Sequence, residues 1–173
     1  MKKALIKYAS LAVGLMTACS NAWAAERYEV VESVMLDADA QQVWDVVKDF
    51  GGIHTWHPAI TATEIVDGEL PLRGAIRVLT VGDGAGTVKE TLTGYSDDDM
   101  KISYTINSTD VVPVKDYAAS MNVVAVADNL SMVIWAGDFL SAPPEGQPDE
   151  MSRDTIATIY RAGLDNLGSA LGQ

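Results

Sequence analysis

An acidic residue on an apolar strand face is the first feature of this sequence that could do chemistry. If residues 87–95 form a strand, Val88, Glu90 and Leu92 share one face, so Glu90 is predicted to point inward. Desolvation would raise the pKa of its carboxyl unless a cation offset it, and Arg77 on the preceding predicted strand is the natural partner. Two interpretations stay open. Glu90 faces a ligand, or Arg77 and Glu90 form an ion pair that braces the sheet.

Three aromatic residues with polar groups are further candidates. Tyr104 and Tyr117 lie on predicted inward faces among apolar neighbours, and their hydroxyls could order the polar end of a ligand. The alternative is that both are core tyrosines hydrogen-bonded to the backbone. Trp135 is predicted to point inward as well, although its strand has two competing apolar faces.

The two histidines, His54 and His57, form an H-x-x-H pair that could direct two imidazoles at a metal. A metal site needs a third ligand, and the glutamate of an H-E-x-x-H helix is missing here. We therefore predict no metal and no cofactor. The sequence also has no G-x-S-x-G elbow and no glycine-rich loop opening a helix, which disfavours hydrolases and nucleotide-binding proteins.

A helical arm is the first element that must position these residues. Apolar residues recur at helical spacing from Val43 to Phe50, directly after the capping residue Asp39. A Gly-Gly break ends this helix, and residues 53–57 allow one further short turn. The large side chains of the arm, Trp56 among them, should be buried against the rest of the chain.

The remaining chain has the pattern of a sheet followed by one long helix. The predicted strands are 27–36, 61–66, 75–81, 87–95, 100–107, 117–126 and 130–139. Helical periodicity returns over residues 149–171. This order predicts an α+β fold in which a curved antiparallel sheet wraps around the last helix, with a space between them that the arm closes at one end.

The first 24 residues have the pattern of a secretory signal peptide. Three lysines precede an apolar run from Ala9 to Ala18, and Ala22-Trp23-Ala24 is an A-x-A cleavage signal. The run is shorter than the roughly 20 residues of a membrane span, so we predict a periplasmic or secreted protein with no integral membrane span. The alternative is a lipoprotein anchored at Cys19.

Cleavage after Ala24 would leave residues 25–173 as a single domain of 149 residues without cysteine. Thiol catalysis and thiolate metal sites are then excluded. The remaining chain carries 9 Lys and Arg against 24 Asp and Glu, a net charge of −15, which disfavours binding to nucleic acid and to anionic membrane surfaces. Nothing in the sequence indicates an oligomeric state.

Several segments resemble the START-related, Bet v 1-like (SRPBCC) superfamily of helix-grip proteins, and in particular its polyketide cyclase/dehydrase-like branch. They are Val43-Trp44, Asp49–Pro58, Gly74–Arg77, Glu90–Leu92, Pro113-Val114, Tyr117, Trp135 and Phe139. The likeness runs from about residue 28 to residue 171. It implies a curved seven-stranded antiparallel sheet around a long C-terminal helix, with two short helices after the first strand.

The resemblance also implies a container for an apolar or amphipathic small molecule, such as a lipid or a polyketide-like compound. The ligand-binding residues it suggests are Trp56, His57, Arg77, Glu90, Tyr104, Tyr117 and Trp135. The alternative is a cyclase- or dehydratase-type enzyme in which Glu90 is the acid/base and Tyr117 or His57 donates a proton. Export favours the non-enzymatic interpretation, because polyketide intermediates are usually made in the cytoplasm.

The plant abscisic acid receptors share this fold, but the residues expected for hormone binding differ. Their lysine for the hormone carboxylate corresponds to Thr61, and their gate and latch correspond to residues 82–86 and 110–114. A receptor for that hormone is therefore not expected. The glycine-rich loop 82–86 could still act as a lid over a cavity mouth.

Overall fold

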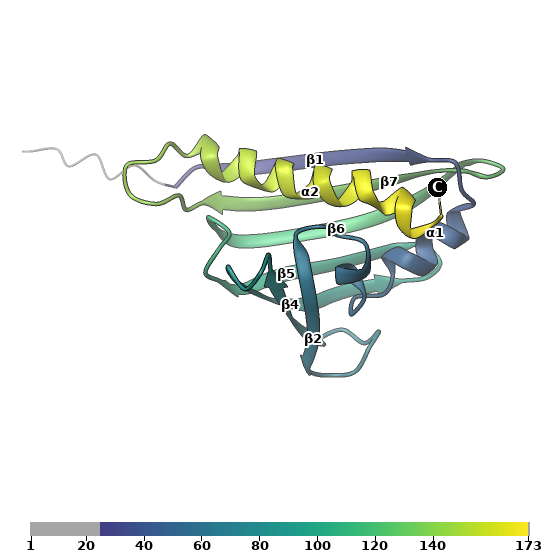
Figure 1. The fold of residues 1–173 in the computed structure, drawn as a ribbon, viewed down its shortest axis with the longest axis horizontal. Coiled ribbons are helices and arrows are strands. Elements are labelled where there is room, and N and C mark those ends of the chain that lie inside the picture. The colour runs from purple at the N-terminus through teal and green to yellow at the C-terminus, as the bar shows by residue number, and fades with distance from the viewer. Residues whose placement is uncertain (1–24, 173) are drawn as a thin grey trace, which may run out of the picture.

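The fold is one antiparallel sheet curved beneath a long C-terminal helix, in a computed structural model that describes residues 25–172 (Figure 1). Its seven strands are β1 (Arg27–Leu36), β2 (Ile60–Asp67), β3 (Ile76–Val81), β4 (Gly86–Ser96), β5 (Lys101–Thr109), β6 (Val114–Ala127) and β7 (Leu130–Ser141). Their order across the sheet is β1-β7-β6-β5-β4-β3-β2. The α+β helix-grip prediction is confirmed, and each predicted strand is present with its ends shifted by at most a few residues.

The arm between β1 and β2 consists of the helix α1 (Ala40–Val47) and a single 3₁₀ turn, η1 (Ile53–Thr55). Asp39 caps α1 as predicted, because its carboxylate accepts a hydrogen bond from the Gln41 amide at 2.8 Å. The buried face of α1 includes Val43 and Trp44. The second short helix is therefore no more than one turn, which suits its place between a Gly-Gly break and Pro58.

The C-terminal helix α2 (Glu150–Ala170) lies along β1 and β7 (Figure 1). Its buried stripe is Ile156, Tyr160, Gly163, Leu164 and Leu167, spaced at three and four residues as an amphipathic helix requires. Fully burying a side chain of the size of leucine contributes roughly 1.5–3 kcal/mol, so this stripe is what holds α2 on the sheet.

The sheet separates between β5 and β6 at one end. The two strands pair only from Lys101↔Asn122 to Thr105↔Ala118. Beyond that point β6 has a bulge at Asp116, whose φ of 47° is unusual for a residue other than glycine. The two strand ends then diverge around an open groove of about 720 Å³, and Ile106 and Tyr117 line both this groove and the interior cavity described below.

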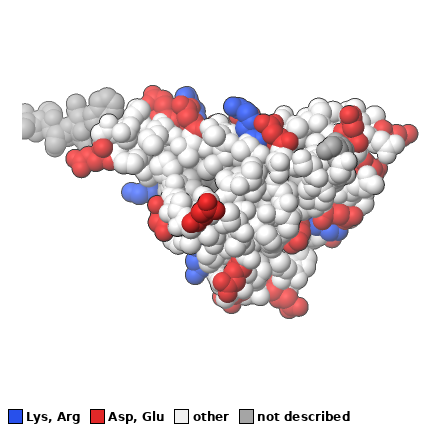
Figure 2. Space-filling view, viewed as in Figure 1, with Lys and Arg blue, Asp and Glu red and all other residues white. Residues whose placement is uncertain are grey.

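Acidic side chains are scattered over the face shown in Figure 2, with fewer basic ones between them, in keeping with the net charge of −12 for the full chain. Within the described residues, no helix is long and apolar enough to cross a membrane. The predicted signal peptide, its cleavage after Ala24 and the alternative anchor at Cys19 lie outside the described residues, so they remain predictions.

Candidate functional site

The interior contains a cavity of about 110 Å³ beneath the first half of α2. Strand residues line it from β2 to β7, and Ile156, Ile159 and Tyr160 line it from α2. Most lining side chains are apolar. The polar exceptions are Arg77, Glu90, His57 and the hydroxyls of three tyrosines. A concave, mostly apolar space with a few fixed polar groups is the usual form of a small-molecule site.

The charged pair in this cavity is the predicted one. Arg77 on β3 is directly opposite Glu90 on β4, and the two side chains are 2% and 5% exposed. Both Nε and Nη2 of Arg77 lie 2.6 Å from Oε2 of Glu90, while Nη1 donates to the Phe50 carbonyl at 2.6 Å. The guanidinium carbon also lies 3.9 Å from the centre of the Phe50 ring. Arg77 and Glu90 thus form an ion pair that ties the arm to the sheet, and both residues also face the cavity.

The two carboxylate oxygens of Glu90 differ. The Nε hydrogen bond and the Nη2 contact of Arg77 both fall on Oε2, and Oε1 accepts no hydrogen bond from the described residues. Burial raises the pKa of Glu90, and the neighbouring Arg77 opposes this increase. Glu90 is therefore a desolvated hydrogen-bonding group with one oxygen held by Arg77 and one available to a ligand.

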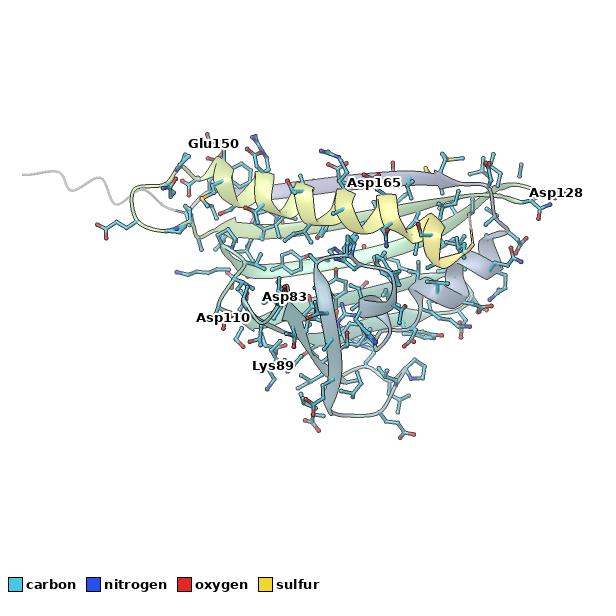
Figure 3. All side chains as sticks on the ribbon, viewed as in Figure 1. Asp83, Lys89, Asp110, Asp128, Glu150 and Asp165 are labelled. Atoms are coloured by element: carbon cyan, nitrogen blue, oxygen red, sulfur yellow. The ribbon has the colours of Figure 1, made fainter. Side chains whose placement is uncertain are left out.

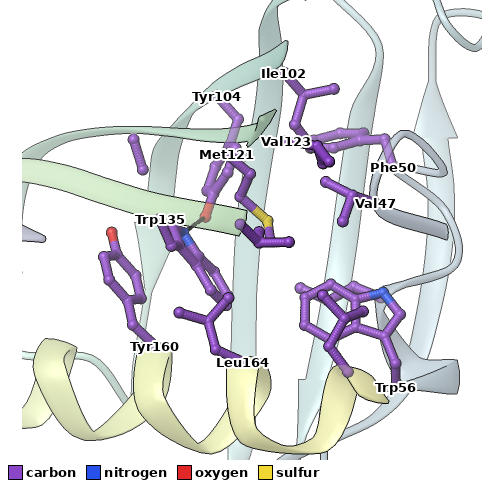
Figure 4. Close-up of a cluster of buried hydrophobic side chains, with 14 of the residues drawn as sticks. Val47, Phe50, Trp56, Ile102, Tyr104, Met121, Val123, Trp135, Tyr160 and Leu164 are labelled. Atoms are coloured by element: carbon purple, nitrogen blue, oxygen red, sulfur yellow. Dashed lines mark hydrogen bonds between the residues drawn. The ribbon is translucent and has the colours of Figure 1, made fainter. Parts of the chain in front are cut away.

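Aromatic side chains form one wall of the cavity, and Figure 4 labels Tyr104, Trp135 and Tyr160 among them. Trp135 on β7 donates its Nε1–H to the Tyr104 hydroxyl at 2.7 Å, and its ring stacks on that of Tyr160 with centroids 4.3 Å apart. The hydroxyls of Tyr117 and Tyr160 are hydrogen-bonded to each other. Burial raises the pKa of all three tyrosines well above the usual value, so their hydroxyls stay neutral.

The inward orientations predicted for Tyr104, Tyr117 and Trp135 are confirmed, whereas their hydrogen-bond partners differ from the backbone alternative. The sequence reasoning missed Tyr160 as a site residue and placed it only in the apolar stripe of the last helix. A hydroxyl inside such a stripe, flanked at i−4 and i+4 by Ile156 and Leu164, is the signal that could have found it.

Two glycines make room for this wall. A Cβ atom on Gly137 of β7 would lie 2.1 Å from the Tyr160 hydroxyl. A Cβ atom on Gly163 of α2 would lie 2.6 Å from the His57 ring and 3.0 Å from the Trp135 ring. At each glycine the shortest of these distances is below any ordinary contact between heavy atoms. A side chain at either position would therefore displace the neighbouring aromatic rings.

His57 is buried, and both of its ring nitrogens are occupied. Nδ1 accepts from the Ala59 amide at 3.2 Å, and Nε2 lies 3.0 Å from the Ile159 carbonyl, to which it must donate. These two partners fix the neutral imidazole protonated on Nε2. Burial lowers the pKa of His57, which also favours the neutral form.

The other arm residues predicted for the site lie elsewhere. Trp56 is buried but does not line the cavity. It follows the η1 turn, and its ring packs edge-on against that of Trp135 with centroids 6.0 Å apart. His54 is exposed, so the H-x-x-H pair does not converge on one point. Within residues 25–172 no three His, Cys, Asp or Glu side chains are grouped closely enough to hold a metal.

One loop borders the cavity, at the end of the molecule where Figure 3 labels Asp110 and Glu150, away from Asp128. The β5–β6 connection supplies Val111 and Val112 to the lining, which the sequence reasoning missed. It contacts the start of β4, where the Thr87 amide donates to Asp110 at 2.6 Å. The proposed lid role of residues 82–86 remains a prediction.

Comparisons with known proteins agree with this architecture. Residues 27–172 match the profile of the family described as "Polyketide cyclase / dehydrase and lipid transport". This chain belongs to that family. A solved structure of the protein XoxI from Bacillus cereus is 26% identical, with a TM-score of 0.72 over 82% of this chain and 94% of that one. The Zhui aromatase/cyclase from a Streptomyces species is 17% identical, with a TM-score of 0.69 over 84% of this chain and 93% of that one, a likeness of fold.

A protein from Thermobifida fusca is 27% identical, with a TM-score of 0.71 over 83% of this chain and 93% of that one. These structures and the family match support the predicted SRPBCC branch. The family description covers both cyclisation chemistry and lipid transport, so the choice between catalysis and binding depends on the groups present in this cavity.

Proposed function

We propose that this chain is an exported binding protein that holds an apolar or amphipathic small molecule in the cavity between the sheet and α2. The observation that carries the proposal is the interior cavity itself, with an almost wholly apolar lining and a few fixed polar groups. Such a lining favours ligands that leave water, and the fixed polar groups orient them. The predicted signal peptide supports a place of action outside the cytoplasm.

The state of the polar groups favours binding over acid–base catalysis. Both nitrogens of His57 are engaged by backbone groups, so this residue has no proton to exchange with a ligand. The pKa of Tyr117 is raised by burial, which makes its hydroxyl a poor acid near neutral pH. Glu90 is fixed by Arg77 on one oxygen. These groups can therefore hold a ligand without having to transfer protons.

The test is a measurement of ligand binding with a pair of matched variants. Native mass spectrometry of the purified protein identifies a retained ligand, and thermal shift with a panel of lipids and aromatic compounds detects added ones. Val88→Phe places a larger side chain in the cavity lining, so we expect it to abolish binding. Val123→Phe enlarges a buried residue outside the lining and should leave binding intact at some cost in stability. An empty protein that no compound stabilises would refute the proposal.

An enzyme of the cyclase or dehydratase type is the second candidate, and the observation in its favour is the raised pKa of Glu90 at the cavity surface. In that case a polyketide-like carbonyl compound would be turned over by the wild-type protein. Glu90→Gln would then abolish turnover while ligand affinity survived. Binding without turnover in the wild-type protein would exclude this candidate.

A further inference from the structure

The polar groups of the cavity specify a hydrogen-bonding pattern for the ligand. Glu90 lines the cavity, and among the described residues its Oε2 accepts from Arg77 whereas its Oε1 accepts no hydrogen bond. A ligand that enters this space displaces water from Oε1. A buried acceptor left without a donor weakens binding, so a fitting ligand must donate a hydrogen bond there.

Arg77 is already engaged by partners within the protein. Its Nε and Nη2 both point at Glu90 Oε2, and its Nη1 donates to the Phe50 carbonyl. The charge of its guanidinium is already balanced by the Glu90 carboxylate. A ligand carboxylate would therefore bring a second negative charge into a desolvated space with no cation to pair with it.

The tyrosine hydroxyls of the aromatic wall supply donors. Tyr104, Tyr117, Tyr160 and the Trp135 indole carry four polar hydrogens among them. The Trp135–Tyr104 and Tyr117–Tyr160 hydrogen bonds use two of these, and a contact between Tyr104 and Tyr117 can use a third. At least one hydroxyl hydrogen is therefore left over within this described cluster. One hydroxyl group on a ligand can satisfy both sides, since it can donate to Glu90 Oε1 and accept from a tyrosine.

The size of the cavity restricts the rest of the ligand. Its volume is about 110 Å³. An engineered apolar cavity of about 150 Å³ in another protein binds benzene, so this space suits about one ring rather than an extended lipid chain. The flat aromatic side chains that border it favour a planar ligand.

We propose that the ligand is a compact neutral hydroxyl compound of the one-ring phenol class, whose hydroxyl donates to Glu90 Oε1 and accepts from a cavity tyrosine. Carboxylates such as fatty or aromatic acids are excluded from the same site. This inference rests on the binding function proposed above, and it narrows the ligand from any apolar or amphipathic molecule to a hydrogen-bond donor of limited size.

Three compounds that differ at one position of the ring test the proposal on the wild-type protein. Dissociation constants are measured by titration calorimetry at pH 7 for 4-methylphenol, 4-fluorotoluene and 4-methylbenzoate. A hydrogen bond to a charged group changes affinity by about 10- to 100-fold, so 4-methylphenol should bind at least about 10-fold more tightly than 4-fluorotoluene. The benzoate should bind more weakly than both. Equal affinities, or a preference for the benzoate, would overturn the proposal.

A double variant tests whether the preference for 4-methylphenol over 4-fluorotoluene depends on the Arg77–Glu90 pair. Arg77→Met with Glu90→Met replaces the ion pair by apolar side chains of similar size, which a fold of this kind tolerates better than the loss of one partner. We expect it to bind 4-fluorotoluene with affinity close to the wild type and to lose the preference for 4-methylphenol. A preference that persisted in this variant would assign the recognition to other groups and overturn the role of Glu90.

The outcomes separate the two proposals. If none of the three compounds binds but a larger apolar compound co-purifies or raises the melting temperature, the binding function stands and the one-ring phenol class is wrong. If no compound of either panel binds, the binding function is wrong and the ligand class falls with it.

Discussion

The interior of this protein has two ends that differ in packing and polarity. Beneath α1 and the last turns of α2, side chains such as Phe50, Met121 and Leu167 belong to a continuous apolar core, and Figure 4 labels the first two. Beneath the first turns of α2, the same strands present Arg77 and Glu90 to a cavity. A single strand can contribute to both ends. In β4, for example, Val88 and Glu90 line the cavity and Leu92 lies in the core.

This difference shows how the fold divides stability from recognition. Close packing supplies dispersion contacts on every side, whereas a lining residue lacks partners toward the cavity. The cavity end also contains the buried ion pair, whose desolvation offsets much of its attraction. We therefore expect the closed end to supply most of the packing energy and the open end to supply selectivity. The predictions that follow test this division.

The largest effect should follow from breaking the ion pair of the cavity end. Arg77→Ala leaves the Glu90 carboxylate buried without its cation, which should lower the free energy of unfolding by about 3–5 kcal/mol in urea denaturation. The double variant with methionine at positions 77 and 90 should be close to the wild type or more stable. As a control, Arg161→Ala removes an exposed ion pair with Glu32 and should cost at most about 1 kcal/mol. An equally small loss for Arg77→Ala would contradict our view of the pair.

Truncating one residue at each end compares their packing directly. Leu167→Ala in the closed core should cost about 3–5 kcal/mol, because its neighbours cannot close the space that is left. Ile156→Ala in the cavity lining should cost less, about 2–3 kcal/mol, because that side chain already lacks contacts toward the cavity. Both values come from equilibrium denaturation. A larger loss for Ile156→Ala would reverse the assignment of the two ends.

Replacing Gly163, the glycine between the two ends, should lower the free energy of unfolding. Gly163→Ala places a methyl group against the rings of His57 and Trp135, and such overpacking should cost about 1–3 kcal/mol. In a His57→Ala background the same change should cost much less, since one of the two rings is gone and alanine favours the helix. The measurement is a double-mutant cycle on the free energy of unfolding. Additive effects would show that the two residues do not contact each other.

A smaller effect should appear in the pH dependence of stability. Burial lowers the pKa of His57 below 6.5, so the unfolded chain binds a proton there more readily than the folded one. The contribution of His57 is complete above pH 6.5 and is lost as the pH falls toward its folded pKa. The slope is at most about 1.4 kcal/mol per pH unit, because one proton is involved.

His57→Gln isolates this contribution, since glutamine can hydrogen-bond but does not titrate. The raised pKa of Glu90 acts with the opposite sign, because it lowers stability as the pH rises above 4.5. Glu90 is present in both proteins, so its effect cancels in the difference between them. Between pH 7 and pH 5 the wild type should lose more stability than His57→Gln. Parallel curves would show that His57 has no shifted pKa.

Local patterns in the sequence determined much of the cavity end. Alternation along two neighbouring segments placed Arg77 and Glu90 on inward faces and suggested their pairing, because strand periodicity is a property of a few consecutive residues. The same reasoning oriented Tyr104, Tyr117 and Trp135. The capping residue and the apolar periodicity likewise determined where α1 begins and which of its faces is buried.

Only the tertiary structure decided which inward residues surround a space. Tyr160 meets Tyr117 from 43 positions away, Val111 reaches the lining from a loop, and Trp56 turns into the core instead. A cavity exists where side chains from several elements fail to meet, and that depends on the curvature of the sheet and the position of α2. Neither quantity is encoded in the period of any one segment.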